Sequence, residues 1–235
     1  MTKNPGVRML GGTGTLLGPS FNTQFNMVVE FLKTSLPQFA KSILHANIQN
    51  ENGLNSRLSR FITNAAAQEI FFANRESMED ETRGDSPAVD IGIFLRVEDA
   101  GIDQPLITVF EGKRLTRKLS NKRRREYVIG HKKGEKLIQL IHCGGIERFK
   151  LAIHGAKFDH AGMVGYLQDG TPDGWREKIN SWICDLCDQP FDPAWSESEK
   201  LAQQKTDGRI SECSSIVNRV SGELHLTHLW IDLVL

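Results

Sequence analysis

The stretch that decides the fold is "PLITVFEGKRL", residues 105–115. Its apolar residues are typical of a buried strand, yet Glu111 and Lys113 stand near its end. Side chains alternate faces along a strand, so these two charged groups point the same way. Burying charge is unfavourable unless the charge is paired or bound to a metal. The strand therefore predicts either a site or a surface ion pair at a strand end.

A second strand is expected just upstream, in "AVDIGIFLR", residues 88–96, which carries Asp90 among apolar residues. The intervening "VEDAGIDQ" is typical of a turn, so the two strands predict a hairpin that brings Asp90 and Glu111 to the same end of a sheet. Two converging carboxylates repel each other unless a cation joins them. Oxygen ligands suit Mg²⁺ or Mn²⁺, and Lys113 would lie beside the metal, where it could orient a water. The alternative is that Asp90 caps a turn.

Asp90, followed 21 residues later by Glu111-Gly112-Lys113 at the end of an apolar strand, resembles the PD-(D/E)xK nucleases, the restriction-endonuclease-like phosphodiesterases. The resemblance implies a mixed central β-sheet flanked by α-helices. It implies that Asp90 and Glu111 bind Mg²⁺ (or Mn²⁺), that the Gly112 carbonyl contributes to the metal site, and that Lys113 assists the attacking water.

The resemblance also implies a further acid on the helix before the hairpin. Glu51 is the better match, because it begins a helix that carries Leu54 and Leu58. Glu69 is a rival: on one continuous helix it would share the face of Glu51 but lie roughly 27 Å further along. We expect only one of the two to reach the site.

The rest of the chain mixes helices and strands without a repeat or a proline-rich linker, which favours one α/β domain over residues 22–235, preceded by a flexible segment over residues 1–21. The expected helices are 22–46 (interrupted at Pro37), 51–75, 120–140 and 173–190. The expected strands after the hairpin are 162–169, 214–220 and 224–235, with a loop over 193–209.

Composition sets broad limits. The chain has 235 residues, of which 39% are hydrophobic and 25% charged, with a net charge of zero. This is typical of a globular protein with a core of its own. No apolar run reaches transmembrane length and no signal-peptide pattern is found, so we expect a cytoplasmic protein without a membrane partner. We expect the four cysteines to be reduced thiols.

Positive charge is concentrated after the Glu-x-Lys motif. Residues 113–136 hold eleven Lys or Arg residues and two acids. Such a block predicts a phosphate-binding surface or, as the alternative, a solvated helix face. The residues expected to grip a nucleic-acid backbone are Arg114, Arg117, Lys118, Lys122, Arg123, Arg124 and Arg125.

Other chemistry is less well supported by the pattern. Cys184 and Cys187 form half a zinc motif, and Cys213, His225 and His228 could supply further ligands, but the two cysteines fall inside an apolar helical pattern.

Four more residues have expected positions. We expect His142 and His154 at helix ends or on the surface, and Tyr127 and Arg148 are candidates to line the cleft.

The prediction is a Mg²⁺-dependent endonuclease that hydrolyses nucleic-acid phosphodiesters, with DNA favoured over RNA by resemblance. The C-terminal half, with "GGIERFK" and "HLTHLWIDL", resembles nuclease-like proteins of bacterial defence loci, which implies an antiviral role and a possible partner protein. The alternatives are a non-catalytic nucleic-acid-binding or assembly subunit that retains the fold, and a zinc-stabilised interaction protein.

Overall fold

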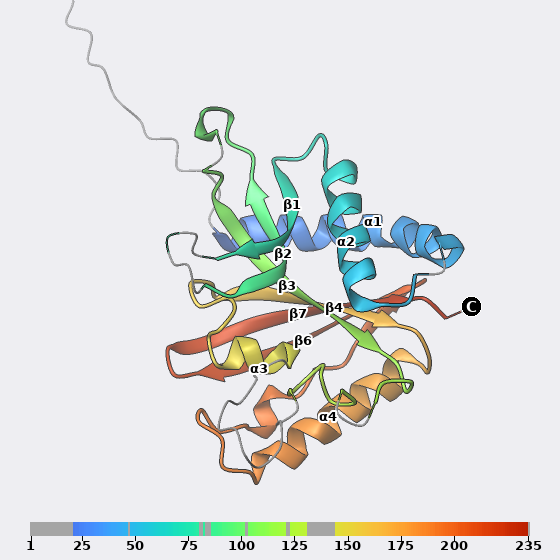
Figure 1. The fold of residues 1–235 in the computed structure, drawn as a ribbon. Coiled ribbons are helices and arrows are strands. Elements are labelled where there is room, and N and C mark those ends of the chain that lie inside the picture. The colour runs from blue at the N-terminus through green and yellow to red at the C-terminus, as the bar shows by residue number, and fades with distance from the viewer. Residues whose placement is uncertain are drawn as a thin grey trace, which may run out of the picture.

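The centre of the molecule is a mixed β-sheet (Figure 1). The computed structural model describes residues 21–46, 48–79, 82, 86–101, 103–120, 123–130 and 144–234. Within them a seven-stranded sheet has the order β1-β2-β3-β4-β7-β6-β5. The strands are β1 Phe71–Met78, β2 Ala88–Leu95, β3 Leu106–Leu115, β4 His160–Leu167, β5 Lys205–Asp207, β6 Ile210–Arg219 and β7 Gly222–Asp232.

Helices cover both faces of this sheet. They are α1 Phe21–Ala46, α2 Glu51–Ala65, α3 Gly145–Lys150 and α4 Pro172–Cys187, with 3₁₀ turns η1 Glu98–Ala100 and η2 Glu197–Glu199. In Figure 1, α1 and α2 lie on one side of the sheet, and α3 and α4 lie on the other. Each side has its own apolar core, because strand residues alternate between the two helix layers. The chain is therefore an α/β protein with a seven-stranded mixed sheet in its described part.

Strand direction changes across the sheet. β1, β2 and β3 are antiparallel neighbours, β3, β4 and β7 run parallel, and β7, β6 and β5 are antiparallel again. The predicted hairpin of β2 and β3 is confirmed, but its pairing extends only from Phe94↔Leu106 to Ile91↔Phe110. Beyond that point β2 continues alongside β1, and β3 continues alongside β4. The two hairpin strands therefore separate just before Glu111.

One predicted helix was wrong in its second half. The helix expected over residues 51–75 ends at Ala65, and the chain re-enters the sheet as β1. Phe71 and Ala73 are buried at alternate positions, and the Thr63 hydroxyl exchanges hydrogen bonds with the backbone of Ala73. With this added strand, β1 and not β2 is the edge of the described sheet.

The basic segment is also corrected. A helix was expected over residues 120–140, but residues 123–128 form consecutive turns. The physical reason is burial, because Tyr127 and Val128 are in the core and draw the chain inward. Residues 121, 122 and 131–143 lie outside the described residues, as do residues 1–20 of the segment predicted over 1–21. The last residue of that segment, Phe21, begins α1.

Two smaller expectations also differ. α1 is not interrupted at Pro37 but runs through it. An internal proline costs about 3 kcal/mol, whereas each buried large apolar side chain contributes about 1.5–3 kcal/mol, and Leu32, Leu36, Phe39 and Ile43 are buried around it. The expected loop over residues 193–209 contains η2 and the short strand β5. Among the described helices, none is long and apolar enough to cross a membrane.

Candidate functional site: carboxylates around a buried ammonium

Three carboxylates from three elements meet at the ammonium group of Lys113, where β2 and β3 separate. Lys113 Nζ lies 3.0 Å from Glu111 Oε2 on β3, 3.2 Å from Glu51 Oε1 on α2 and 3.6 Å from Asp90 Oδ2 on β2. The Gly112 carbonyl oxygen lies 3.3 Å from the same nitrogen. The structure therefore brings together the four side chains that the sequence predicted for the site, and the Gly112 carbonyl lies beside them.

The start of α2 sets the position of Glu51. The Asn50 side chain caps the helix by accepting a hydrogen bond from the Gly53 backbone nitrogen at 2.7 Å, which makes Glu51 the first helical residue. The rival, Glu69, is exposed and lies beyond the end of α2. The helix that would have carried Glu69 on the same face does not extend that far.

Close contact between α2 and β3 depends on Gly112. A Cβ atom at this position would lie 2.0 Å from Asn55 Oδ1, so only glycine fits there without movement of the neighbour. Asn55 is buried, and its Oδ1 accepts a hydrogen bond from the Tyr166 hydroxyl at 2.8 Å. The absence of a side chain at Gly112 lets α2 approach β3 and brings Glu51 within reach of Lys113.

Where β2 and β3 separate, the Asp90 side chain takes the place of a backbone hydrogen-bond partner for Gly112. Its Oδ2 accepts a hydrogen bond from the Gly112 backbone nitrogen at 2.9 Å. Burial raises the pKa of Asp90 to about 6, and the neighbouring charge of Glu111 adds to this effect, while Lys113 opposes it. Asp90 is thus held less firmly in its charged form than Glu111 is.

Glu111 is fully buried and is held from both sides. Besides Lys113, its Oε1 lies 3.1 Å from Arg148 Nη1 and 2.9 Å from His154 Nε2. Burial alone would raise the pKa of Glu111, but Lys113, His154 and Arg148 outweigh it and lower the pKa well below its usual range. Burial likewise opposes the charge of Lys113, but the three carboxylates prevail and raise its pKa.

His154 is a member of the site that sequence reasoning missed. It was expected at a helix end or on the surface, but it is only 1% exposed. Burial opposes its protonation, yet the hydrogen bond with Glu111 and the nearby carboxylate of Glu79 raise its pKa. Arg148, a candidate for the cleft, does contact Glu111. His142 lies outside the described residues.

Tyr127 does not line a cleft. Its hydroxyl lies 2.8 Å from His228 Nδ1 and accepts a hydrogen bond from Trp230 Nε1 at 2.8 Å, deep in the core. His228 Nε2 lies 2.9 Å from Ser215 Oγ, which resembles a nucleophile and its base. All of these groups are at most 5% exposed, and burial lowers the pKa of His228 to about 3. The cluster is a satisfied part of the core, because no substrate can reach it without unfolding.

The donors around Lys113 fit a hard divalent cation by their chemistry. Carboxylate oxygens and a backbone carbonyl are the ligands that Mg²⁺ and Mn²⁺ prefer. In the conformation described, however, the positive group among these oxygens is the lysine ammonium. No group of three or more His, Cys, Asp or Glu residues in the described part of the chain is placed to hold a metal ion. That finding covers the described cysteines as well, and Cys187 Sγ contacts the Ile183 carbonyl within α4.

The basic residues after β3 have unequal surroundings. Arg114 contacts the Gln49 carbonyl, and Arg117 lies 3.8 Å from Asp169. Arg123 pairs with Glu126 and approaches Glu51, and Arg125 binds the Trp182 carbonyl at 2.9 Å and Asp185 at 3.2 Å. Arg125 is therefore a tether to α4. Lys118 and Arg124 are exposed, and Lys122 lies outside the described residues.

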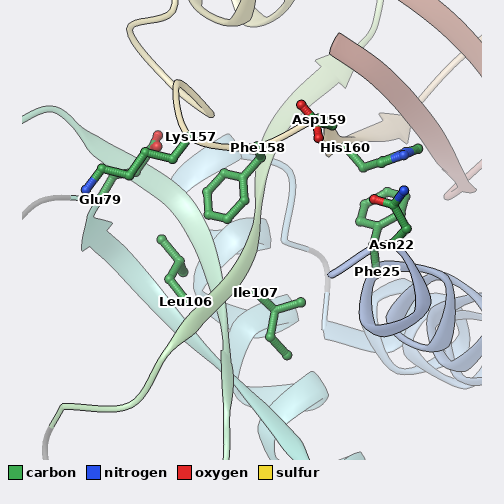
Figure 2. Close-up of a pocket in the computed structure, with 9 residues that line it drawn as sticks. All are labelled: Asn22, Phe25, Glu79, Leu106, Ile107, Lys157, Phe158, Asp159 and His160. Carbon is green, nitrogen blue, oxygen red and sulfur yellow. The ribbon is translucent and has the colours of Figure 1, made fainter. Parts of the chain in front are cut away.

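A cavity of about 280 Å³ lies at the beginning of β3 (Figure 2). The residues around it are Asn22, Phe25, Glu79, Leu106, Ile107, Lys157, Phe158, Asp159 and His160. Glu79 connects the cavity with the carboxylate cluster, since its Oε1 accepts a hydrogen bond from the Gly155 nitrogen at 2.7 Å and lies 3.5 Å from His154 Nδ1. Asp90, Glu111 and Lys113 are not among the residues that line this cavity.

Comparison with known proteins gives no relative. No family model, no curated protein and no solved structure matches this chain. The fold and site together define an α/β protein with a buried carboxylate cluster at a point where two antiparallel strands separate.

Proposed function

We propose that the protein is a metal-dependent nuclease of the restriction-endonuclease-like type. The observation that carries the proposal is the convergence of Glu51, Asp90 and Glu111 on Lys113. The Glu51 and Asp90 side chains are 16% and 23% exposed, so the cluster reaches the surface on the side of these two acids. A site built from acids on a helix and two strands can receive a substrate there without rearrangement of the sheet.

The charge of the cluster supports a role beyond structure. Four carboxylates (Glu51, Glu79, Asp90 and Glu111) face three fixed cations, Lys113, Arg123 and Arg148, and one histidine, His154. A purely structural ion network gains stability only when its charges are matched. Here the carboxylates still outnumber the fixed cations. The pKa of Asp90 is raised first by its burial, and the negative charge of Glu111 adds to this effect. Such an excess favours uptake of a further cation.

The residues would divide the work as follows. Glu51, Asp90, Glu111 and the Gly112 carbonyl would hold Mg²⁺ or Mn²⁺, which when bound neutralises negative charge on the phosphodiester and activates water. Glu111 keeps its position without Lys113, because Arg148 and His154 hold its other oxygen. The Lys113 side chain is then available to orient the attacking water and to stabilise the charge that develops on the phosphate.

The nucleic-acid part of the proposal relies on the basic segment. Arg117, Lys118 and Arg124 lie on the surface just after β3. Contacts between such residues and phosphates position a strand without reading its sequence. DNA is proposed over RNA, and a role in defence is proposed, from the resemblance described above.

The second candidate is a non-catalytic nucleic-acid-binding or assembly subunit. One observation favours it: the ammonium of Lys113 is itself a counter-ion for all three acids. In that case the cluster would stabilise the junction of α2, β2 and β3 and would not need a metal.

Cleavage assays distinguish the two candidates. We expect the full chain to cleave DNA in Mg²⁺ or Mn²⁺, not in EDTA, and not when Ca²⁺ is the sole divalent cation. Asp90→Ala should abolish cleavage, whereas the matched control Glu69→Ala, an exposed acid outside α2, should cleave as the wild type does. Undiminished cleavage in EDTA would contradict the metal mechanism, and tight binding without cleavage in any cation would favour the assembly subunit.

A further inference from the structure

Helix α4 carries a lysine whose ammonium group lies beside two tryptophan rings. Lys178 Nζ lies 4.8 Å from the centre of the Trp175 ring and 5.5 Å from that of Trp182. Both rings are largely buried, and Trp175 Nε1 donates a hydrogen bond to the Asp169 carbonyl at 2.6 Å. The ammonium is therefore positioned by rigid aromatic neighbours and has a preferred location, unlike that of a freely moving surface lysine.

The positive charges of two arginines from the segment after β3 act on the Lys178 ammonium. Burial lowers the pKa of Lys178, and the positive charges of Arg124 and Arg117 lower it further, while Asp169 opposes them. Asp169 is already engaged, because its Oδ2 accepts hydrogen bonds from the Thr116 hydroxyl and the Arg117 backbone nitrogen. Arg117 Nε also lies 3.8 Å from Asp169 Oδ1, so this acid interacts with both the segment after β3 and the lysine of α4.

This group of cations is continuous with the carboxylate cluster. Arg123 Nη2 lies 3.7 Å from Glu51 Oε2, and Arg124 is the next residue along the chain. Arg125 then ties the same segment to the Trp182 carbonyl of α4. Figure 1 shows the chain after β3 passing between the sheet and α4. A path of positive charge therefore leads from the proposed catalytic position to α4.

We propose that Arg117, Arg124 and Lys178 bind backbone phosphates of the nucleic-acid strand whose phosphodiester lies at the carboxylate cluster. The inference rests on the proposed function and adds α4 to the substrate-binding surface. Gathering like charges is unfavourable in the free protein, and an anion relieves that repulsion. Phosphates match these donors, since guanidinium groups bind them through paired hydrogen bonds and ammonium binds them as a point charge.

The test is the salt dependence of DNA binding by the full chain, measured by fluorescence anisotropy of a labelled duplex in EDTA, so that no cleavage occurs. Lys178→Gln, Arg124→Gln and Arg117→Gln should each weaken binding and reduce the slope of log affinity against log salt by about 0.9, the value for one lost phosphate contact. Lys178→Arg should keep the wild-type slope. Lys41→Gln, which removes an exposed lysine on α1, should behave as the wild type does.

Arg124→Gln changes an exposed side chain, so it tests the inference even if Lys178→Gln disturbs the tryptophans. If the wild type binds DNA and the three variants keep its slope, the inference is overturned and the proposed function stands. If the wild type does not bind DNA, both are overturned. If polyglutamate competes for the surface as well as inorganic polyphosphate does, the partner is an acidic peptide and the inference is wrong.

Discussion

At the scale of single residues, the site is governed by the position of one ammonium group. Lys113 Nζ has an oxygen of Glu51, Asp90 and Glu111 within 3.6 Å, and its side chain is only 6% exposed. A metal ion and the Lys113 ammonium cannot both interact with those oxygens as strongly as either would alone. Under the proposed function, the lysine would therefore compete with the metal ion for its ligands, although the same lysine would be needed for the chemistry.

This competition leads to the first prediction. Lys113→Ala should lose turnover by on the order of 10²–10⁴, the usual contribution of a positioned acid–base group, yet bind Mn²⁺ at least as tightly as the wild type. Asp90→Ala should lose both turnover and Mn²⁺ affinity. Lys113→Met, which keeps most of the aliphatic stem, should match Lys113→Ala. Calorimetric titration of Mn²⁺ alongside cleavage rates checks this, and wild-type turnover in Lys113→Ala would show that the lysine is only a structural counter-ion.

A second prediction concerns the buried histidine of the core. The folded pKa of His228 is about 3, against 6.5 in the unfolded chain, because burial disfavours its charged form. Between these values the unfolded chain binds a proton that the folded chain excludes. Stability must therefore fall as pH falls from 6.5 towards 3, by about 5 kcal/mol at most.

The measurement is urea unfolding between pH 7 and pH 4. In His228→Gln the free energy of unfolding should depend less steeply on pH, although it should be lower at neutral pH because the fit to Tyr127 and Ser215 is lost. His225→Gln changes an exposed histidine of the same strand and is the matched control. A pH dependence unaltered in His228→Gln would mean that other groups govern acid unfolding.

The sequence predicted which acidic residues and lysine meet, but not all the groups that support them. Asp90, Glu111 and Lys113 could be found because alternation along two strands of a hairpin determines their faces. His154 could not be predicted in this way, because it lies in a turn 43 residues after Glu111. A turn has no regular repeat from which the direction of a side chain could be inferred. A histidine near several charged residues in "IERFKLAIHG" was the only signal available.

At the scale of elements, the approach of α2 to β3 depends on the missing side chain at Gly112. Gly112→Ala should destabilise the protein by about 1–3 kcal/mol, as overpacking does, and reduce activity because α2 and Glu51 must move. The cost should be smaller in the Asn55→Ala background, where the clashing amide is gone. A double-mutant cycle by thermal unfolding measures this difference.

The matched control for that cycle is Gly174→Ala, where the added Cβ would have only the Thr171 hydroxyl as a close neighbour, at 3.2 Å. It should change stability much less than Gly112→Ala does. Equal costs at the two glycines, or strict additivity of Gly112→Ala and Asn55→Ala, would contradict the packing argument.

Most elements could be predicted from their patterns, and the failures have physical causes. The alternation in β2 and β3 and the apolar face of α4 were sufficient, because each pattern spans several periods. β1 was missed because "NAAAQEIFFANR" combines strong helix formers with spacing that suits either structure. Pairing with β2 selects the strand, and that tertiary contact is not encoded locally.

At the scale of the whole molecule, metal binding should be visible as stability. A ligand that binds only the folded state stabilises it by about 2.7 kcal/mol when its concentration is one hundred times its Kd. For a chain of this size each kcal/mol corresponds to roughly 2–4 °C in Tm. Mn²⁺ should therefore raise the Tm of the wild type in a concentration-dependent way.

Asp90→Ala provides the control for this effect, because it removes one of the proposed ligands of the metal ion. Its Tm should respond little to the same Mn²⁺ concentrations. An equal rise in both proteins would indicate weak binding elsewhere on the surface, and no rise in the wild type would count against a metal in the cluster.

The order of the sheet has a consequence for biosynthesis. Of the described strands, β7 is the last to be made, yet it inserts at the centre of the sheet between β4 and β6. Sixty-five residues separate the end of β4 at Leu167 from the end of β7 at Asp232. At about 5–20 residues per second on the ribosome, the outer edge of β4 stays unpaired for roughly 3–13 s. During that interval the nascent chain exposes a parallel, apolar strand edge, so we expect its yield to depend on chaperones and to fall when translation of this interval is slowed.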